Sequence, residues 1–208
     1  MLLEQNDLPS TEATQKYIEE HGADAIPKLE EAYQIVGTIQ SGTDEYGNPK
    51  YQGLTTDMLN IYDRDGADGL RQYKSALETA NRIGADNITT EEWKTYRSGN
   101  KQGFDELVRT RKVLEDNDLA NTELNRSYVQ EYGNEIIPVL KDANEAISQI
   151  QKGVDKYGDA KWFSPNEKMI EIYRQNGKKG VETYADIYTK DDIEAKIGRA
   201  VQQECRDR

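Results

Sequence analysis

The stretch Gly22-Ala23-Asp24-Ala25-Ile26-Pro27-Lys28-Leu29-Glu30-Glu31-Ala32 has a counterpart 111 residues later, Gly133-Asn134-Glu135-Ile136-Ile137-Pro138-Val139-Leu140-Lys141-Asp142-Ala143. The match extends without a gap over residues 17–73 and 128–184, where 20 of 57 positions are identical. Chance would give only a few identities at a fixed offset. The sequence therefore predicts an internal duplication with two pseudo-equivalent halves, residues 1–115 and 116–208, and a helical C-terminal tail.

The local pattern within these stretches is helical. Apolar residues recur at intervals of three and four, which places one apolar stripe on each long helix. Thr89–Glu92 and Ser164–Glu167 fit a capping box, with Pro165 at the first helical position. Glycines stand where each short helix is expected to end, because glycine accepts the left-handed backbone of such a turn: Gly22, Gly66, Gly133 and Gly177.

A shorter period of 34 residues lies within the longer one. Five segments share one plan, in which a capped short helix, a glycine turn and a longer helix follow one another, and they begin near Ser10, Thr55, Thr89, Thr122 and Ser164. A helix hairpin of this size cannot bury its apolar face alone and must stack on neighbours. We therefore predict an all-α fold of stacked helix-hairpin repeats, α-solenoid-like or bundled, with short loop or hairpin insertions.

Composition narrows the class of protein. About 37% of residues are apolar when glycine is counted and tyrosine is not, below the ~45–50% of average chains, which suits a thin core. The single histidine and single cysteine argue against zinc sites and Ser-His or Cys-His catalysis, so we expect no cofactor and no metal. No apolar run is long enough to span a membrane. The first residues lack the pattern of a signal peptide.

Charge is distributed unevenly along the chain. The net charge is −12, and the first 50 residues carry ten acidic and three basic groups, whereas the last 58 are nearly neutral. Because no cluster of Lys and Arg is present, direct nucleic-acid binding is not expected.

Two features invite a functional interpretation and have a simpler structural one. The acidic run from Asp63 to Gly69 resembles a calcium loop, but its spacing fails at the fifth, sixth and twelfth positions, and only its glycines recur in the second half. It is interpreted as a solvated helix-hairpin turn, with a weak cation site as the alternative.

A tyrosine recurs near the end of each short helix. We expect these rings to pack between hairpins, the alternative being a ligand-binding ladder.

Two insertions interrupt the repeat, at residues 41–53 and 152–164, and both keep the pattern Asp-x-Tyr-Gly-x-x-Lys followed by an aromatic residue. Insertions in repeat proteins often lie on the binding face, and aromatic side chains among charges often anchor interfaces. The alternative is that they fold back and cap the hairpin ends. The predicted partner-binding residues are Tyr46, Lys50, Tyr51, Tyr157, Lys161, Trp162 and Phe163.

The sequence thus favours a non-catalytic structural or scaffolding protein. Its expected partners are proteins, in a homo- or hetero-oligomeric assembly such as a virion, located in the cytoplasm or in a particle assembled there. The first alternative is an acidic inhibitor that occupies the basic cleft of a nucleic-acid-binding protein. A glycan-processing enzyme with paired carboxylates is a third hypothesis, but no phosphate loop or nucleophile motif accompanies the acidic residues.

Overall fold

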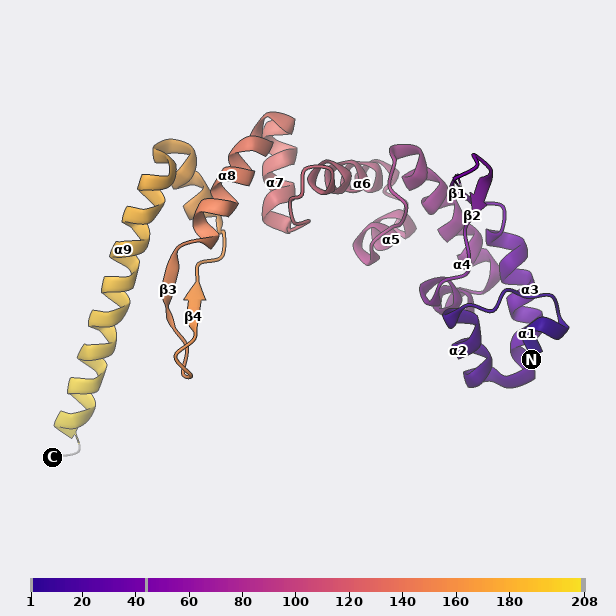
Figure 1. The fold of residues 1–208 in the computed structure, drawn as a ribbon, viewed down its shortest axis with the longest axis horizontal. Helices are drawn as coiled ribbons and strands as arrows, with labels where there is room; N and C mark the ends of the chain where they lie inside the picture. The colour runs from indigo at the N-terminus through magenta and orange to yellow at the C-terminus, as the bar shows by residue number, and fades with distance from the viewer. Residues whose placement is uncertain (1, 44, 207–208) are drawn as a thin grey trace. The chain divides into compact units, whose positions relative to one another are not determined.

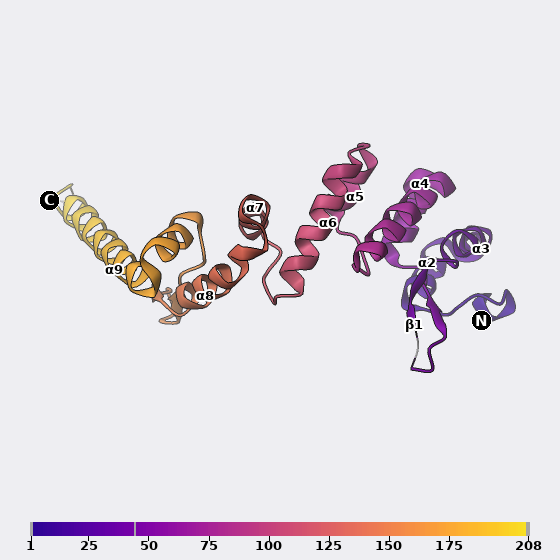
Figure 2. The same ribbon diagram turned by 90° about the horizontal axis from the view of Figure 1, so that it is seen from above.

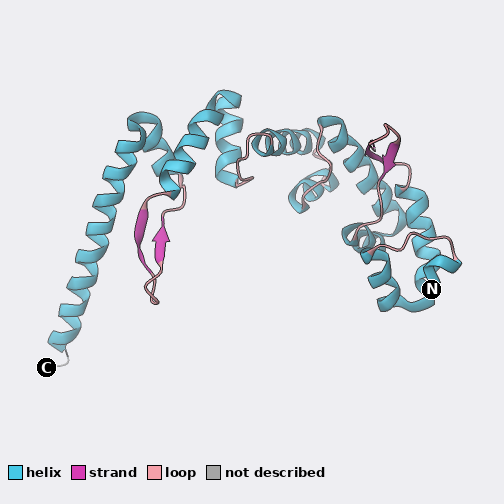
Figure 3. Cartoon of the chain, in the orientation of Figure 1, coloured by secondary structure: helices cyan, strands magenta, loops and turns pink. Residues whose placement is uncertain are grey.

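The computed structural model describes the main chain of residues 2–43 and 45–206 and the side chains of residues 2–39 and 45–189. The described chain is mostly helical, with two short strand pairs (Figures 1 and 3). This confirms the predicted helical class. Contacts divide the chain into two compact units, Met1–Lys112 and Val113–Arg208. The side chain of Cys205 lies outside the described residues.

In the first unit, the elements are α1 (Leu2–Gln5), α2 (Glu12–His21), α3 (Ala25–Val36), β1 (Gln40–Thr43), β2 (Pro49–Tyr51), α4 (Thr56–Ile83), α5 (Thr90–Arg97) and most of α6 (Lys101–Glu115), whose last three residues belong to the second unit. A 3-10 turn at Gly22–Asp24 joins α2 to α3. In the second, they are α7 (Glu123–Tyr132), α8 (Ile137–Ser148), β3 (Gln151–Val154), β4 (Ala160–Trp162) and α9 (Glu167–Arg206), with a 3-10 turn at Gly133–Ile136.

Threonine and asparagine side chains begin the helices. The hydroxyls of Thr11, Thr55, Thr89 and Thr122 each accept the main-chain N–H of the residue three positions later. At α9, Asn166 performs this role, because its Oδ1 accepts the N–H of Met169 at 3.1 Å. The predicted capping box at Ser164 with Pro165 as the first helical residue is therefore wrong. The helix begins later because the asparagine side chain supplies the cap.

Two glycines bend long helices sharply. Gly66 in α4 has φ 68° and ψ −167°, and Gly177 in α9 has φ 65° and ψ −164°. This region of backbone space is almost restricted to glycine. Three residues after each bend comes a second glycine. A Cβ on Gly69 would lie 2.3 Å from Asp65 Cβ, and one on Gly180 would lie 2.4 Å from Asn176 Cβ. The first glycine adopts the backbone conformation of the turn, and the second avoids a steric clash that a Cβ atom would cause.

Three helices end in the same hydrogen-bonded cap. The N–H of Leu8 donates to the carbonyl of Leu3, that of Ala85 to Ala80, and that of Leu119 to Leu114. In each case the preceding residue has positive φ, namely Asp7, Gly84 and Asp118. This is the Schellman arrangement, in which an apolar residue after the cap packs back on the last turn.

Each unit has its own core. In the first, α3 packs on α4, and fully buried side chains include Leu29, Leu70 and Phe104. In the second, α8 packs on α9, around Leu140, Met169 and other buried residues. A buried ion pair joins α5 to α6, where Arg111 Nε donates to Glu92 Oε1 at 2.7 Å and both side chains are at most 4% exposed.

Candidate functional site

The predicted insertions form two β-hairpins. β1 pairs antiparallel with β2, with Gln40 opposite Tyr51, and β3 pairs with β4, with Gln151 opposite Trp162. Both ladders have one irregularity directly after this first pair. The β1–β2 hairpin projects away from α3 and α4 (Figure 2), and the β3–β4 hairpin projects from the end of α8 (Figure 1).

Local hydrogen bonds shape the tip of the second hairpin. Asp155 Oδ1 accepts the N–H groups of Tyr157 at 2.8 Å and of Asp159 at 3.0 Å. An aspartate that bonds the main chain two residues ahead is a typical turn former. Gly47 and Gly158 have φ of 84° and 92° at the two tips, which explains why the Tyr-Gly pair recurs in both insertions.

Four of the predicted aromatic residues are exposed at the hairpins. The exposed fractions are 81% for Tyr46, 58% for Tyr51, 76% for Tyr157 and 54% for Trp162. The predicted lysines at positions 50 and 161 are exposed as well. Because side chains alternate along a strand, each lysine lies on the opposite face of its hairpin from the neighbouring Tyr51 or Trp162.

Phe163 differs from the other predicted residues. It is only 7% exposed and belongs to the second core. Its ring meets Tyr188 of α9 edge to face, with 5.9 Å between centroids, and Lys152 Nζ lies 5.7 Å from its centroid. Phe163 therefore anchors the base of the second hairpin and does not present a surface to a partner. The prediction for this residue is wrong, because the strand ends at Trp162 and the next side chain turns inward.

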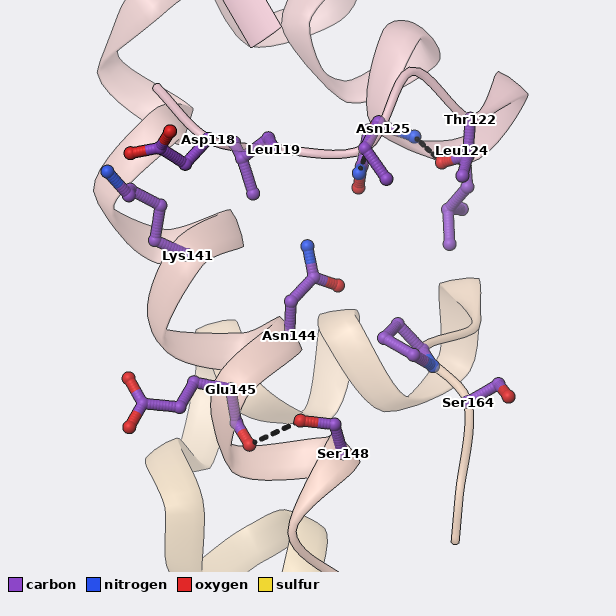
Figure 4. Close-up of a pocket in the computed structure, with 12 residues that line it drawn as sticks. Asp118, Leu119, Thr122, Leu124, Asn125, Lys141, Asn144, Glu145, Ser148 and Ser164 are labelled. Atoms are coloured by element: carbon purple, nitrogen blue, oxygen red, sulfur yellow. Dashed lines mark hydrogen bonds between the residues drawn. The ribbon is translucent and has the colours of Figure 1, made fainter. Parts of the chain in front are cut away.

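The second unit also contains an open pocket of about 610 Å³, which sequence reasoning did not identify (Figure 4). Its walls are the 118–125 segment, one side of α8, and the pair Ser164 and Pro165. Asn144 of α8 points into the space, and its amide makes no hydrogen bond to any described residue (Figure 4). Pockets of this size are in the range that holds small molecules or side chains.

A polar cluster occupies the α4 bend of the first unit. The Tyr17 hydroxyl donates to Asp63 Oδ1 at 2.6 Å, and Lys28 Nζ donates to the same oxygen at 2.9 Å. His21 Nε2 lies 3.5 Å from Asp63 Oδ2. Burial favours a raised pKa for Asp63, but the bonds from Tyr17 and Lys28 outweigh it, so the pKa is lowered. Burial, and secondly the bond to Asp63, raise the pKa of Tyr17.

These contacts show how the acidic turn is arranged. Asp63 is held by donors from α2 and α3, while Asp65 pairs with Arg97 at 3.2 Å. Two more of the recurrent tyrosines in the first unit pack in the same manner as Tyr17, since Tyr62 donates to Glu31 and Tyr96 donates to Ser75 at 3.0 Å. The rings thus lie at helix junctions with their hydroxyls on polar groups, as expected for structural tyrosines.

No family model, no curated protein and no solved structure matches the chain in comparisons with known proteins. Among the described residues, no helix has the length and apolarity needed to cross a membrane. The same residues contain no group of three or more His, Cys, Asp or Glu side chains that could hold a metal ion.

Proposed function

We propose that the protein is a non-catalytic helical scaffold that acts through protein–protein contacts made by its two β-hairpins. One observation carries this proposal: both hairpins expose an aromatic residue at the same place in the ladder, Tyr51 opposite Gln40 and Trp162 opposite Gln151. A second exposed aromatic, Tyr46 or Tyr157, stands at each tip.

The physical basis is that these side chains are exposed on two short hairpins. A two-stranded hairpin is at best marginally stable alone, and its outer edges have unpaired N–H and C=O groups that a partner strand or loop can use. Tyrosine and tryptophan are the residues that most often dominate interface energies once they are buried. More than half of the full surface of Tyr51 and of Trp162 is exposed, and a partner that covers either residue would remove that apolar area from water.

The proposal includes an internally duplicated, repeat-based architecture. It is supported by features that recur at an offset of 111 residues in the sequence and in the local structure. These are the N-caps Thr11 and Thr122, the bends Gly66 and Gly177, and the hairpin registers. We further propose that the protein belongs to a larger assembly, such as a virion, in the cytoplasm or a particle assembled there.

The test begins with capture of binding proteins from the native source and their identification by mass spectrometry. Affinity for each purified candidate is then measured with Tyr51→Ala/Trp162→Ala and with Leu2→Ala, which shortens an exposed apolar residue outside the hairpins. We expect the double variant to weaken binding at least tenfold with an unchanged helical circular dichroism signal, since a hot-spot aromatic contributes about 2 kcal/mol or more. Leu2→Ala should bind as the wild type does.

Binding of equal strength by the double variant would show that the hairpins are not the contact surface. Titration with salt separates the proposal from the acidic inhibitor, because affinity for a basic cleft falls steeply as salt screens the charges, whereas contacts made by aromatic residues are much less affected.

A further inference from the structure

The offset of 111 residues relates the pocket of the second unit to a tyrosine in the first. Asn144 of α8 stands 111 residues after Tyr33 of α3. Tyr33 is half-buried and packs against the first core, as do Leu8 and Ala13, and its hydroxyl oxygen is buried. The residues 111 positions after Leu8 and Ala13 are Leu119 and Leu124, and both line the pocket.

The hydroxyl end of the ring can be placed in the same way. Burial raises the pKa of the Tyr33 hydroxyl, and Thr11 acts on that pKa in the opposite direction. The buried hydroxyl has no hydrogen bond of ordinary geometry to a described residue. The residue 111 positions after Thr11 is Thr122, which lines the pocket near Asn144. The second unit therefore has counterparts of these residues, with Leu124 where the first unit has Ala13, and lacks the ring itself.

The local backbone supports this correspondence. Asp7 and Asp118, which precede Leu8 and Leu119, have φ of 52° and 55°. In both units the next N–H closes the same helix cap, on Leu3 at 3.0 Å and on Leu114 at 2.9 Å. The equivalent caps lead into equivalent segments, which begin at Leu8 in the first unit and at Leu119 in the second. The side chain of Tyr33 in α3 or of Asn144 in α8 then decides whether the space beside that segment is filled.

We propose that this pocket binds the phenol ring of a tyrosine presented by a partner protein. Leu119, Leu124 and Pro165 offer apolar contact, while Thr122, Asn144 and Ser148 offer polar groups for the hydroxyl. A phenol matches that mixture because its ring is apolar and its hydroxyl seeks a hydrogen bond. The site is distinct from the hairpin tips, so it stands or falls independently of the function proposed above.

The pocket is tested on the full chain with N-acetyl-tyrosinamide as the probe and two-dimensional amide NMR as the readout. We expect millimolar binding with shifts in residues 118–125 and 141–148. Asn144→Tyr supplies the residue that the first unit has and should weaken binding at least tenfold, whereas Asn144→Ala keeps the pocket open and should change it less than threefold. Tyr33→Asn removes the corresponding ring of the first unit, so the probe should then also shift the amide signals of residues 8–14 in the folded variant.

Three results would overturn the proposal. The first is equal affinity of Asn144→Tyr and the wild type. The second is equal affinity of N-acetyl-leucinamide and N-acetyl-tyrosinamide, because the pocket would then have no preference for the phenol. The third comes from sedimentation velocity at increasing concentration: self-association that Asn144→Tyr abolishes would assign the pocket to a tyrosine of a second copy of this chain and not to another protein.

Discussion

Gly66 offers the most direct test of how the fold is specified, because replacement by alanine isolates backbone strain. A Cβ at this position would meet no atom within 4 Å, so Gly66→Ala introduces no steric clash with other parts of the protein. What it introduces is an alanine at φ 68° and ψ −167°. A non-glycine residue in this region costs about 1–3 kcal/mol. Alanine also makes the unfolded chain less flexible, which recovers about 0.4–1 kcal/mol.

The expected net loss is therefore about 1–2 kcal/mol, which corresponds to a fall in melting temperature of roughly 4–16 °C for a unit of about 100 residues. Trp93 is buried in the first unit and is one of two tryptophans in the chain. Its fluorescence during urea unfolding, in a Trp162→Phe background, reports on the first unit without a signal from the hairpin.

Gly53→Ala is the matched control. Its Cβ would also meet no atom within 4 Å, but its φ is not positive, so we expect stability to be unchanged or slightly increased. Gly69→Ala should be more damaging than Gly66→Ala, because its Cβ would lie 2.3 Å from Asp65 Cβ. Equal stability of Gly66→Ala and Gly53→Ala would refute the reasoning, since the bend would then not need glycine.

Two further predictions concern polar groups in the first unit. Arg111→Met should reduce the free energy of unfolding by about 3–5 kcal/mol in urea titrations, because it leaves the buried Glu92 carboxylate without its ion pair; adding Glu92→Leu should restore much of the loss, and no restoration would contradict this cause. The raised pKa of Tyr17 should make stability fall as pH rises above 10, and the lowered pKa of Asp63 should make it fall as pH drops below 3.8. Tyr17→Phe should reduce the alkaline loss in urea midpoints measured at several pH values and leave the share that comes from the raised pKa values of Tyr33, Tyr62 and Tyr73; an unchanged alkaline loss would contradict the assignment.

Features encoded in a few consecutive residues were predictable. Threonine caps, glycine bends and the apolar stripe act within one or two turns, so sequence spacing alone indicates them. The error at Ser164 and Pro165 is instructive, because Ser164 and Asn166 are both acceptable N-cap residues and the structure uses Asn166. The inward turn of Phe163 was not predicted either, since the end of a strand decides which face the next side chain takes.

Features that join distant segments were not predictable in this way. The Glu92–Arg111 pair joins two residues that are 19 positions apart in the sequence, and 39 acidic and 27 basic residues offer too many pairings for sequence to select one. The pocket could not be predicted from the sequence either, because it depends on the absence of an aromatic ring at Asn144. This absence has a meaning only once the structure shows that the hydroxyl of Tyr33, at the matching position, is buried.

The two units keep equivalent bends and differ in the charge placed on them. Asp63, just before the first bend, is held by Tyr17 and Lys28. The residue 111 positions later is Arg174, whose guanidinium lies 4.1 Å from the centroid of the Tyr132 ring and donates to Glu171 at 2.8 Å. An anion and a cation thus occupy matching corners.

Glycines make the corner in both units, while the residues that set its charge differ between them. Backbone geometry and surface chemistry therefore vary independently in this chain. The same separation applies to the pocket, where the cap is retained and the ring is not. For the scaffold proposed above, equivalent corners of opposite charge favour two unlike partners, because a scaffold that repeats one contact would need the same chemistry at both places.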